Sequence, residues 1–196
     1  MSFIREIPEA EATGTVRALY DADLKTQGFV NNHLKVFSLR PEALEAWRVL
    51  IGAIRGKMRL RLYELVTLAA ASALECTYCM LAHGSVLRKN FFDDQQIIAI
   101  GKDYQHAKLE PAEIAAMAYA RKVARNSASV TQEDIENLRS HGFSDEEICD
   151  IALTASARSF FSNALNGLGA EPDKRYSDLT EGVIEALEAG RPFKRG

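Results

Sequence analysis

Two cysteines separated by two residues, Cys76 and Cys79, are the residues of this 196-residue chain whose types and spacing best suit chemistry. Sulfurs one helical turn apart can close a disulfide with little movement of the backbone, so this spacing is typical of a redox switch. His83 follows one turn after Cys79, and on a helix the three side chains fall within roughly 60° of one another. The three side chains could therefore form one site.

Glu64 could join this site only if the chain bends between it and the cysteines. In one straight helix it would lie roughly 18 Å along the axis from Cys76. A helical hairpin that bends near Glu75 would instead bring Glu64 level with His83. The second helix would then begin at the cysteines, where free backbone amides favour thiolate, so we expect the pKa of both thiols to be lowered. Glu64 could orient His83 or accept a proton through it.

The chain resembles a known family through this arrangement. Glu64, the pair Cys76 and Cys79, and His83 match the E-x11-C-x2-C-x3-H signature of AhpD-like alkylhydroperoxidases, in the carboxymuconolactone decarboxylase superfamily. Helix order and the late segment 160–176 resemble the peroxidase-related branch. The resemblance implies an AhpD-like helical bundle with the CxxC at the N-terminus of a core helix, packed as a homo-oligomer (dimer, trimer or hexamer). The superfamily's decarboxylases lack the cysteine pair, so its presence favours redox chemistry.

The resemblance also implies an activity and a role for each residue. The protein would be a thiol-dependent peroxidase that reduces small organic hydroperoxides or hydrogen peroxide. Cys79 would be the peroxidatic thiolate and Cys76 the resolving partner, whereas position alone would favour Cys76 as the more acidic thiol. Glu64 and His83 would form the proton relay. Tyr78 stands where some family members have a second histidine, so we give it an auxiliary role.

The cycle implied by the resemblance ends in a disulfide, which an external dithiol must reduce. We therefore expect an unidentified thiol reductant protein as partner, and neither a cofactor nor a metal. Two other functions stay open. The protein could be a thiol-disulfide carrier that feeds another peroxidase, or a structural metal-binding or oligomeric scaffold, because the four residues are also zinc ligands. An inert buried cysteine pair is a further alternative.

The elements that must position these residues are all helical. Apolar residues recur at helical spacing, and no run alternates with a period of two, so the sequence predicts an all-α fold. Small side chains on every face of Ala69–Ala71 predict close packing against another helix. Caps at Thr131 and Ser144 each predict the start of a helix. The other expected helices cover about residues 16–28, 33–39, 41–56, 62–75, 76–90, 93–100, 111–125 and 179–187, and the helix after Ser144 reaches about 168.

Several residues receive structural interpretations. We expect Trp47 and the pair Phe160–Phe161 in the core, where an apolar wall near the dithiol would suit an organic hydroperoxide. We interpret the lone Cys149 as a small core residue. We expect the tail, residues 190–196, to be frayed or docked on another subunit. Polar surface or helix-end positions are expected for His33, His106 and His141.

Bulk properties limit the partners. The net charge is −3 and no basic cluster carries aromatic residues, so nucleic acid is not expected as a partner. The apolar stretches are too short for a membrane span and residues 1–11 do not resemble a signal peptide, so we expect a cytoplasmic protein without a membrane partner. The length fits a single AhpD-like helical domain over residues 1–196, with its core motif at 60–90 and a peripheral C-terminal helix and tail at 177–196.

Overall fold

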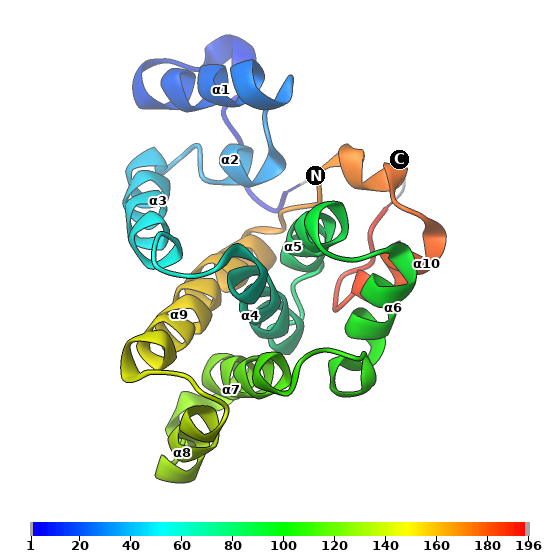
Figure 1. The fold of residues 1–196 in the computed structure, drawn as a ribbon. Helices are drawn as coiled ribbons and strands as arrows, with labels where there is room; N and C mark the ends of the chain where they lie inside the picture. Colours follow the sequence, from blue (N-terminus) through cyan, green and yellow to red (C-terminus); the bar gives the residue numbers. More distant parts are fainter. Residues whose placement is uncertain (1, 195–196) are drawn as a thin grey trace.

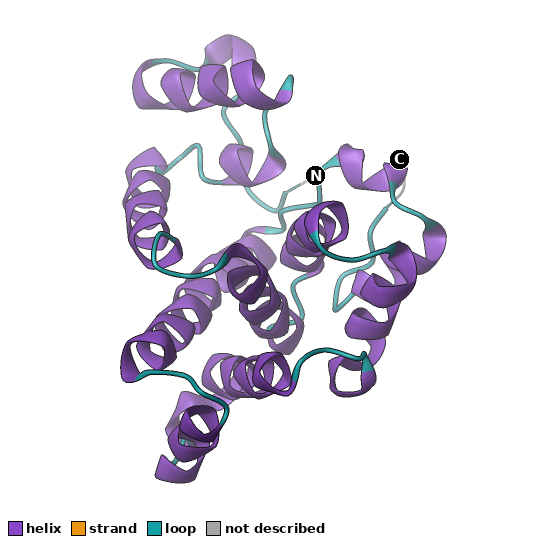
Figure 2. Cartoon of the chain, in the orientation of Figure 1, coloured by secondary structure: helices purple, strands orange, loops and turns teal. Residues whose placement is uncertain are grey.

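The computed structural model describes residues 2–194, in which helix is the only regular secondary structure (Figures 1 and 2). The predicted all-α class is therefore confirmed. No helix in this range is long and apolar enough to cross a membrane. The helices are α1 (Gly14–Gln27), α2 (Asn32–Val36), α3 (Pro41–Arg55), α4 (Leu60–Ala73), α5 (Thr77–Asn90), α6 (Asp94–Asp103), α7 (Pro111–Asn126), α8 (Gln132–Ser140), α9 (Asp145–Leu168) and α10 (Glu181–Leu187).

Local signals in the sequence place the helix boundaries. Pro41 and Pro111 occupy the first turns of α3 and α7, where a missing N–H leaves no hydrogen bond unmade. At the start of α9, the Glu147 N–H donates to Ser144 Oγ at 3.2 Å and the Ser144 N–H donates to the Glu147 carboxylate at 3.0 Å. This reciprocal cap is predicted from the sequence, as is the one at Thr131 that begins α8. Gly169 ends the same helix with a positive φ of 75°, which favours glycine.

Helix α4 lies at the centre of the molecule (Figure 1). Every residue from Leu62 to Ala71 is buried, and the helix packs against α5, α7 and α9. The small residues Ala69–Ala71 allow neighbours to approach on several sides, which confirms the predicted close packing. Glu64 is the buried carboxylate of this helix. Its charge must therefore be balanced from inside the protein.

The chain bends between α4 and α5, as the hairpin hypothesis requires. Glu75 takes a left-handed conformation with φ of 52°, and the Cys76 N–H donates to the Ala71 carbonyl at 3.0 Å. Cys76 is the N-cap of α5, so Cys79 lies in the first turn. The bend therefore brings the chemically interesting part of α5 against the side of α4.

The C-terminal segment returns from α10 to the start of α5 (red in Figure 1). The Ala189 N–H donates to Thr77 Oγ1 at 3.2 Å, Gly190 lies against the Glu75 carbonyl, and the Phe193 ring is buried. The expectation of a tail that is frayed or docked on another subunit is therefore wrong for residues 190–194. The tail packs on its own chain because it can bury an aromatic ring there. Residues 195–196 lie outside the described part.

Two expected core residues are exposed. Cys149 lies on the surface, because Ile148 and Ile151 carry the buried face of α9 and Cys149 points away from it. Phe160 is 51% exposed, whereas its neighbour Phe161 is buried. Adjacent helical residues point about 100° apart, so only one of the two rings can face the core.

Close packing of α6 on α10 predicts the effect of one substitution. A Cβ at Gly101 would lie 2.4 Å from the backbone oxygen of Ala186, which cannot move aside as a side chain can. We expect Gly101→Ala to lower the free energy of unfolding by about 1–3 kcal/mol. Gly52→Ala, on the exposed face of α3 with open space around it, should raise that free energy by about 0.5–1 kcal/mol. Urea unfolding measures both, and equal stabilities would contradict the close contact.

Candidate active site

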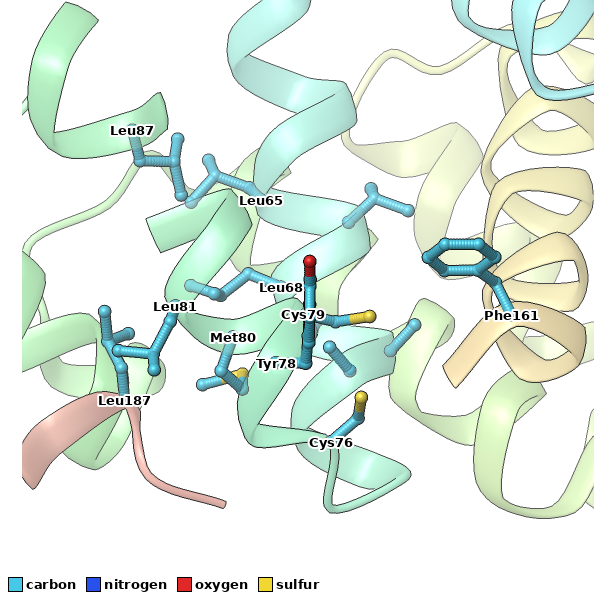
Figure 3. Packing of buried hydrophobic residues seen from close by; sticks show 14 of the residues in the cluster. Leu65, Leu68, Cys76, Tyr78, Cys79, Met80, Leu81, Leu87, Phe161 and Leu187 are labelled. Carbon is cyan, nitrogen blue, oxygen red and sulfur yellow. The ribbon is translucent and has the colours of Figure 1, made fainter. Parts of the chain in front are cut away.

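The two sulfurs that the sequence singles out are buried at the start of α5. Cys76 is 0% exposed and Cys79 is 1% exposed. Figure 3 shows the Cys79 sulfur pointing toward Phe161 of α9. From the same helix, Ser162 Oγ donates a hydrogen bond to Cys79 Sγ at 3.3 Å. The dithiol is therefore enclosed by helices.

The surroundings make the two thiols unequal. A hydrogen bond from the Cys76 thiol is the main cause that lowers the pKa of Cys79 to about 6, and it outweighs the effect of burial. The positive charge of Arg158, the charge that His83 carries once it has accepted a proton, and the hydrogen bond from Ser162 lower this pKa further. The pKa of Cys76 is raised, because its proton is held between the sulfurs and the thiol is buried. The expectation of two lowered pKa values is therefore right for Cys79 and wrong for Cys76.

Glu64 and His83 meet across the hairpin. Glu64 Oε2 lies 2.5 Å from His83 Nδ1, and the carboxylate is buried. An ionised carboxylate can only accept a hydrogen bond, so Nδ1 carries the proton and Nε2 is left as a base. His83 lies one turn after Cys79 on the same helix. The structure thus brings together the residues of the predicted relay. Within residues 2–194, no group of three or more His, Cys, Asp or Glu side chains is placed to bind a metal ion.

Tyr78, between the two cysteines, is the centre of a second hydrogen-bonded network. Its hydroxyl donates to Asp173 Oδ2 at 2.6 Å and accepts from the His33 backbone N–H at 3.2 Å. His33 Nδ1 lies 3.1 Å from the same oxygen. Because the single hydroxyl proton goes to Asp173, this imidazole nitrogen must donate. From the sequence, Tyr78 is expected in an auxiliary role and His33 at the surface or a helix end, whereas nothing in the sequence indicates Asp173.

Burial fixes the charges of this network. It lowers the pKa of His33 to about 4, so the imidazole is neutral at neutral pH. It raises the pKa of Tyr78 and of Asp173. The other oxygen of Asp173 accepts from the Asn32 N–H at 2.7 Å. The network therefore ties the first turn of α5 to the start of α2 and to the segment that follows α9.

Arg158 is the second residue of the site that sequence reasoning missed. It is 3% exposed and lies one turn before Ser162 on α9. One guanidinium nitrogen, Nη2, donates to the Tyr63 hydroxyl at 2.8 Å, and Cζ lies 5.1 Å from the centre of the Trp47 ring. A lone cation in the small-residue part of α9 was the signal that could have indicated it.

Aromatic side chains form a wall beside Arg158 and the dithiol. Trp47 stacks on Phe161 with the ring centres 4.0 Å apart, and Phe37 also stacks on Phe161, with the ring centres 5.7 Å apart. Trp47 and Phe161 pack against the core, as their predicted roles require. Figure 3 shows one of these rings, Phe161, on the side toward which the Cys79 sulfur points.

The unequal thiols predict a titration with one step. We expect the thiolate absorbance of a Cys149→Ser variant, which lacks the exposed third thiol, to rise once with a midpoint at about pH 6. Cys79→Ser should abolish this step, and Ser162→Ala should move it upward because a donor to the thiolate is lost. A midpoint near the ordinary cysteine value of about 8.5 would contradict the proposed electrostatics.

The same pKa shift predicts a pH dependence of stability. Because folding lowers the pKa of Cys79, the unfolded chain binds more protons between about pH 6 and the ordinary cysteine pKa. The free energy of unfolding should therefore rise with pH across this range, more in the parent protein than in Cys79→Ser. This contribution is complete above the unfolded pKa and is lost as pH falls through about 6.

The tail over the start of α5 predicts the accessibility of Cys76. A Cβ at Gly190 would lie 2.2 Å from the Glu75 carbonyl oxygen, and its φ of 129° is strained for other residues. Gly190→Ala should therefore displace the tail and increase the alkylation rate of Cys76 by about tenfold or more, since a buried thiol reacts only when it becomes exposed. Mass spectrometry of alkylated peptides measures this rate. Gly142→Ala, at another positive φ and in open space, is the matched control, and an equal increase there would contradict a covering role.

Comparison with known proteins agrees with this geometry. Residues 41–122 match the carboxymuconolactone decarboxylase family. The solved structure of an uncharacterised peroxidase-related protein with an alkylhydroperoxidase AhpD core, from Ralstonia eutropha JMP134, matches with a TM-score of 0.81 at 26% identity, over 89% of this chain and 94% of that chain. A peroxidase-related protein from Silicibacter sp. TM1040 matches with a TM-score of 0.77 at 26% identity, over 87% and 91%.

A more distant match is a debrominase. The debrominase Bmp8 shares the fold with a TM-score of 0.74 at 16% identity, over 95% of this chain and 98% of that chain. No match was found among curated proteins. The matched family segment contains Glu64, both cysteines of the dithiol and His83, and the structural matches extend over most of the chain. Residues 41–122 are therefore similar to the carboxymuconolactone decarboxylase family, and the chain has the fold of AhpD-like proteins.

Proposed function

We propose that the protein is a thiol-dependent peroxidase that reduces small organic hydroperoxides or hydrogen peroxide through a Cys76/Cys79 dithiol-disulfide cycle. The main support is the Cys79 sulfur, whose lowered pKa makes it a thiolate at neutral pH. The peroxidase-related names of two structural relatives agree with this chemistry. Since a debrominase has the same fold, the fold alone does not select the substrate. The proposal therefore rests on the thiolate and its relay.

The first step oxidises Cys79. His83 Nε2 accepts the thiol proton, and the thiolate attacks the terminal oxygen of the peroxide. The S–O bond forms as the O–O bond breaks, and the leaving oxygen takes the proton from His83. The products are a sulfenic acid and an alcohol, or water when the substrate is hydrogen peroxide. Glu64 holds the imidazole in the required orientation and balances its positive charge during the step.

The second step forms the disulfide. In the reduced protein the Cys76 thiol donates its hydrogen to the Cys79 thiolate, which raises the pKa of Cys76. Once Cys79 carries a neutral sulfenic acid, this acceptor charge is gone. Cys76 can then lose its proton and attack the Cys79 sulfur. The S–S bond forms, the S–O bond breaks, and water leaves with the proton from Cys76.

The cycle closes by thiol-disulfide exchange with an external dithiol, which supplies two electrons. Contact with Cys76 requires movement of the C-terminal segment, since Ala189 and Gly190 lie across the start of α5. We propose a cytoplasmic thiol protein as this reductant.

We also propose that the protein forms a homo-oligomer. Exposed apolar side chains on the neighbouring helices α3 and α9 support this proposal: Val49, Leu50, Leu153 and Phe160.

Stopped-flow kinetics with cumene hydroperoxide and hydrogen peroxide test the proposed function. The reduced protein should react far faster than a free thiol, and Cys79→Ser should lose this reaction. Cys76→Ser should complete one turnover and stop at a sulfenic acid that dimedone traps. His83→Gln should slow the first step by about 10²-fold or more, because the proton transfer is lost.

The exposed Cys149 provides the matched control, since Cys149→Ser should react as the parent does. A parent rate near that of a free thiol would refute the peroxidase. If rapid disulfide exchange with a small dithiol remained in that case, the protein would instead be a thiol-disulfide carrier.

A further inference from the structure

Arg158 is a buried cation whose charge lowers the pKa of Cys79 but which has no carboxylate partner among residues 2–194. Isolated buried charges are costly, so such groups are normally paired. In the part of the chain that the structure describes, no carboxylate forms an ion pair with Arg158. Its Nη2 donates to the Tyr63 hydroxyl, but its buried Nε–H has no acceptor within residues 2–194. Folding thus leaves a charged donor unused in the interior.

A second unused donor belongs to the same cluster. The indole Nε1–H of Trp47 is buried and has no acceptor among the residues that the structure describes. The Trp47 ring centre lies 5.1 Å from Arg158 Cζ, and Phe161 stacks on the same ring. An unsatisfied buried donor costs about 1–3 kcal/mol. Two such donors in one buried cluster indicate a place for a ligand that accepts hydrogen bonds.

Arg158 lies on α9, the helix toward which the Cys79 sulfur points. Arg158 is one helical turn before Ser162, whose hydroxyl contacts Cys79 Sγ at 3.3 Å. Figure 3 shows the Cys79 sulfur pointing toward Phe161, which also contacts Arg158 through its ring at 5.7 Å. A group that approaches the sulfur from α9 therefore comes close to the guanidinium.

We propose that Arg158 and Trp47 form an oxyanion-binding site beside Cys79, which binds the alkoxide or hydroxide oxygen that leaves the peroxide. The proposal rests on the peroxidase function and adds binding residues to it. During attack, the S–O bond forms, the O–O bond breaks, and negative charge moves from sulfur to the leaving oxygen. A preorganised cation near both atoms stabilises this charge throughout. His83 then supplies the proton that neutralises the leaving oxygen.

Binding of a carboxylate tests the site independently of catalysis. The Cys79→Ser variant removes the thiolate that competes for Arg158, and Trp47 is the single tryptophan, so its fluorescence reports on the site. Acetate should cause a saturable change, whereas acetamide, of similar shape but neutral, should not. Adding Arg158→Gln should weaken acetate binding by about tenfold or more, as expected for loss of a charge-assisted bond.

Arg121 offers the matched control, because it lies over the Tyr104 ring and donates to Ser72 outside the site. Adding Arg121→Gln should leave acetate binding unchanged. If Arg158→Gln does not fold, Arg158→Lys tests the same point, since lysine keeps the charge and loses the Nε donor. Acetamide binding as tight as that of acetate, or full acetate binding in either Arg158 variant, would overturn the site.

Kinetics above the pKa of Cys79 separate this role from simple thiolate stabilisation. The comparison uses a pH above the titration midpoint of Cys79 in both the parent and Arg158→Gln, where a role limited to the thiolate predicts equal rates. The oxyanion site predicts a larger loss with cumene hydroperoxide, which releases a basic alkoxide, than with peracetic acid, which releases a stable carboxylate. Equal rates would overturn the catalytic part. A slow parent protein with acetate binding that depends on Arg158 would overturn the peroxidase and support the anion site.

Discussion

A carboxylate buried in the central helix is the constraint on which the site depends. Glu64 cannot be hydrated inside α4, so its charge needs a partner within the fold. His83 supplies that partner at 2.5 Å, which requires α5 to run back along α4 at this height. The bend at Glu75 satisfies this geometry, and the same bend makes Cys76 the N-cap of α5. One buried hydrogen bond thus sets the position of both sulfurs.

The difference between the two thiols comes from their neighbours and not from their order in the motif. The position of Cys76 at the start of the helix favours its ionisation, but the Cys76 thiol donates its proton in a hydrogen bond to the Cys79 sulfur. Cys79 additionally receives the Ser162 hydrogen bond and the field of Arg158, both from α9. Because α9 lies far from the motif in sequence, a CxxC peptide alone would not reproduce this assignment.

The sequence was most informative about features whose physical cause lies within a few neighbouring residues. Helical periodicity, the Ser144 cap and prolines in first turns act within a few residues, so the helices could be predicted with their approximate ends. The Glu64 to His83 pairing could also be predicted, since a single bend determines it. The positions of His33, Asp173 and Arg158 could not, because their partners belong to segments that only tertiary packing brings together. The tail was misjudged for the same reason.

The contacts of α5 also bear on when the site forms during folding. Tyr78 reaches partners 45 and 95 residues away, and the Cys79 sulfur reaches one 83 residues away. Contacts that close such long loops carry a large entropic cost and tend to form late. Until then both cysteines are ordinary thiols, mostly protonated at neutral pH. The reactive thiolate is therefore a product of the completed fold, and an incomplete chain is spared the oxidation that such a nucleophile invites.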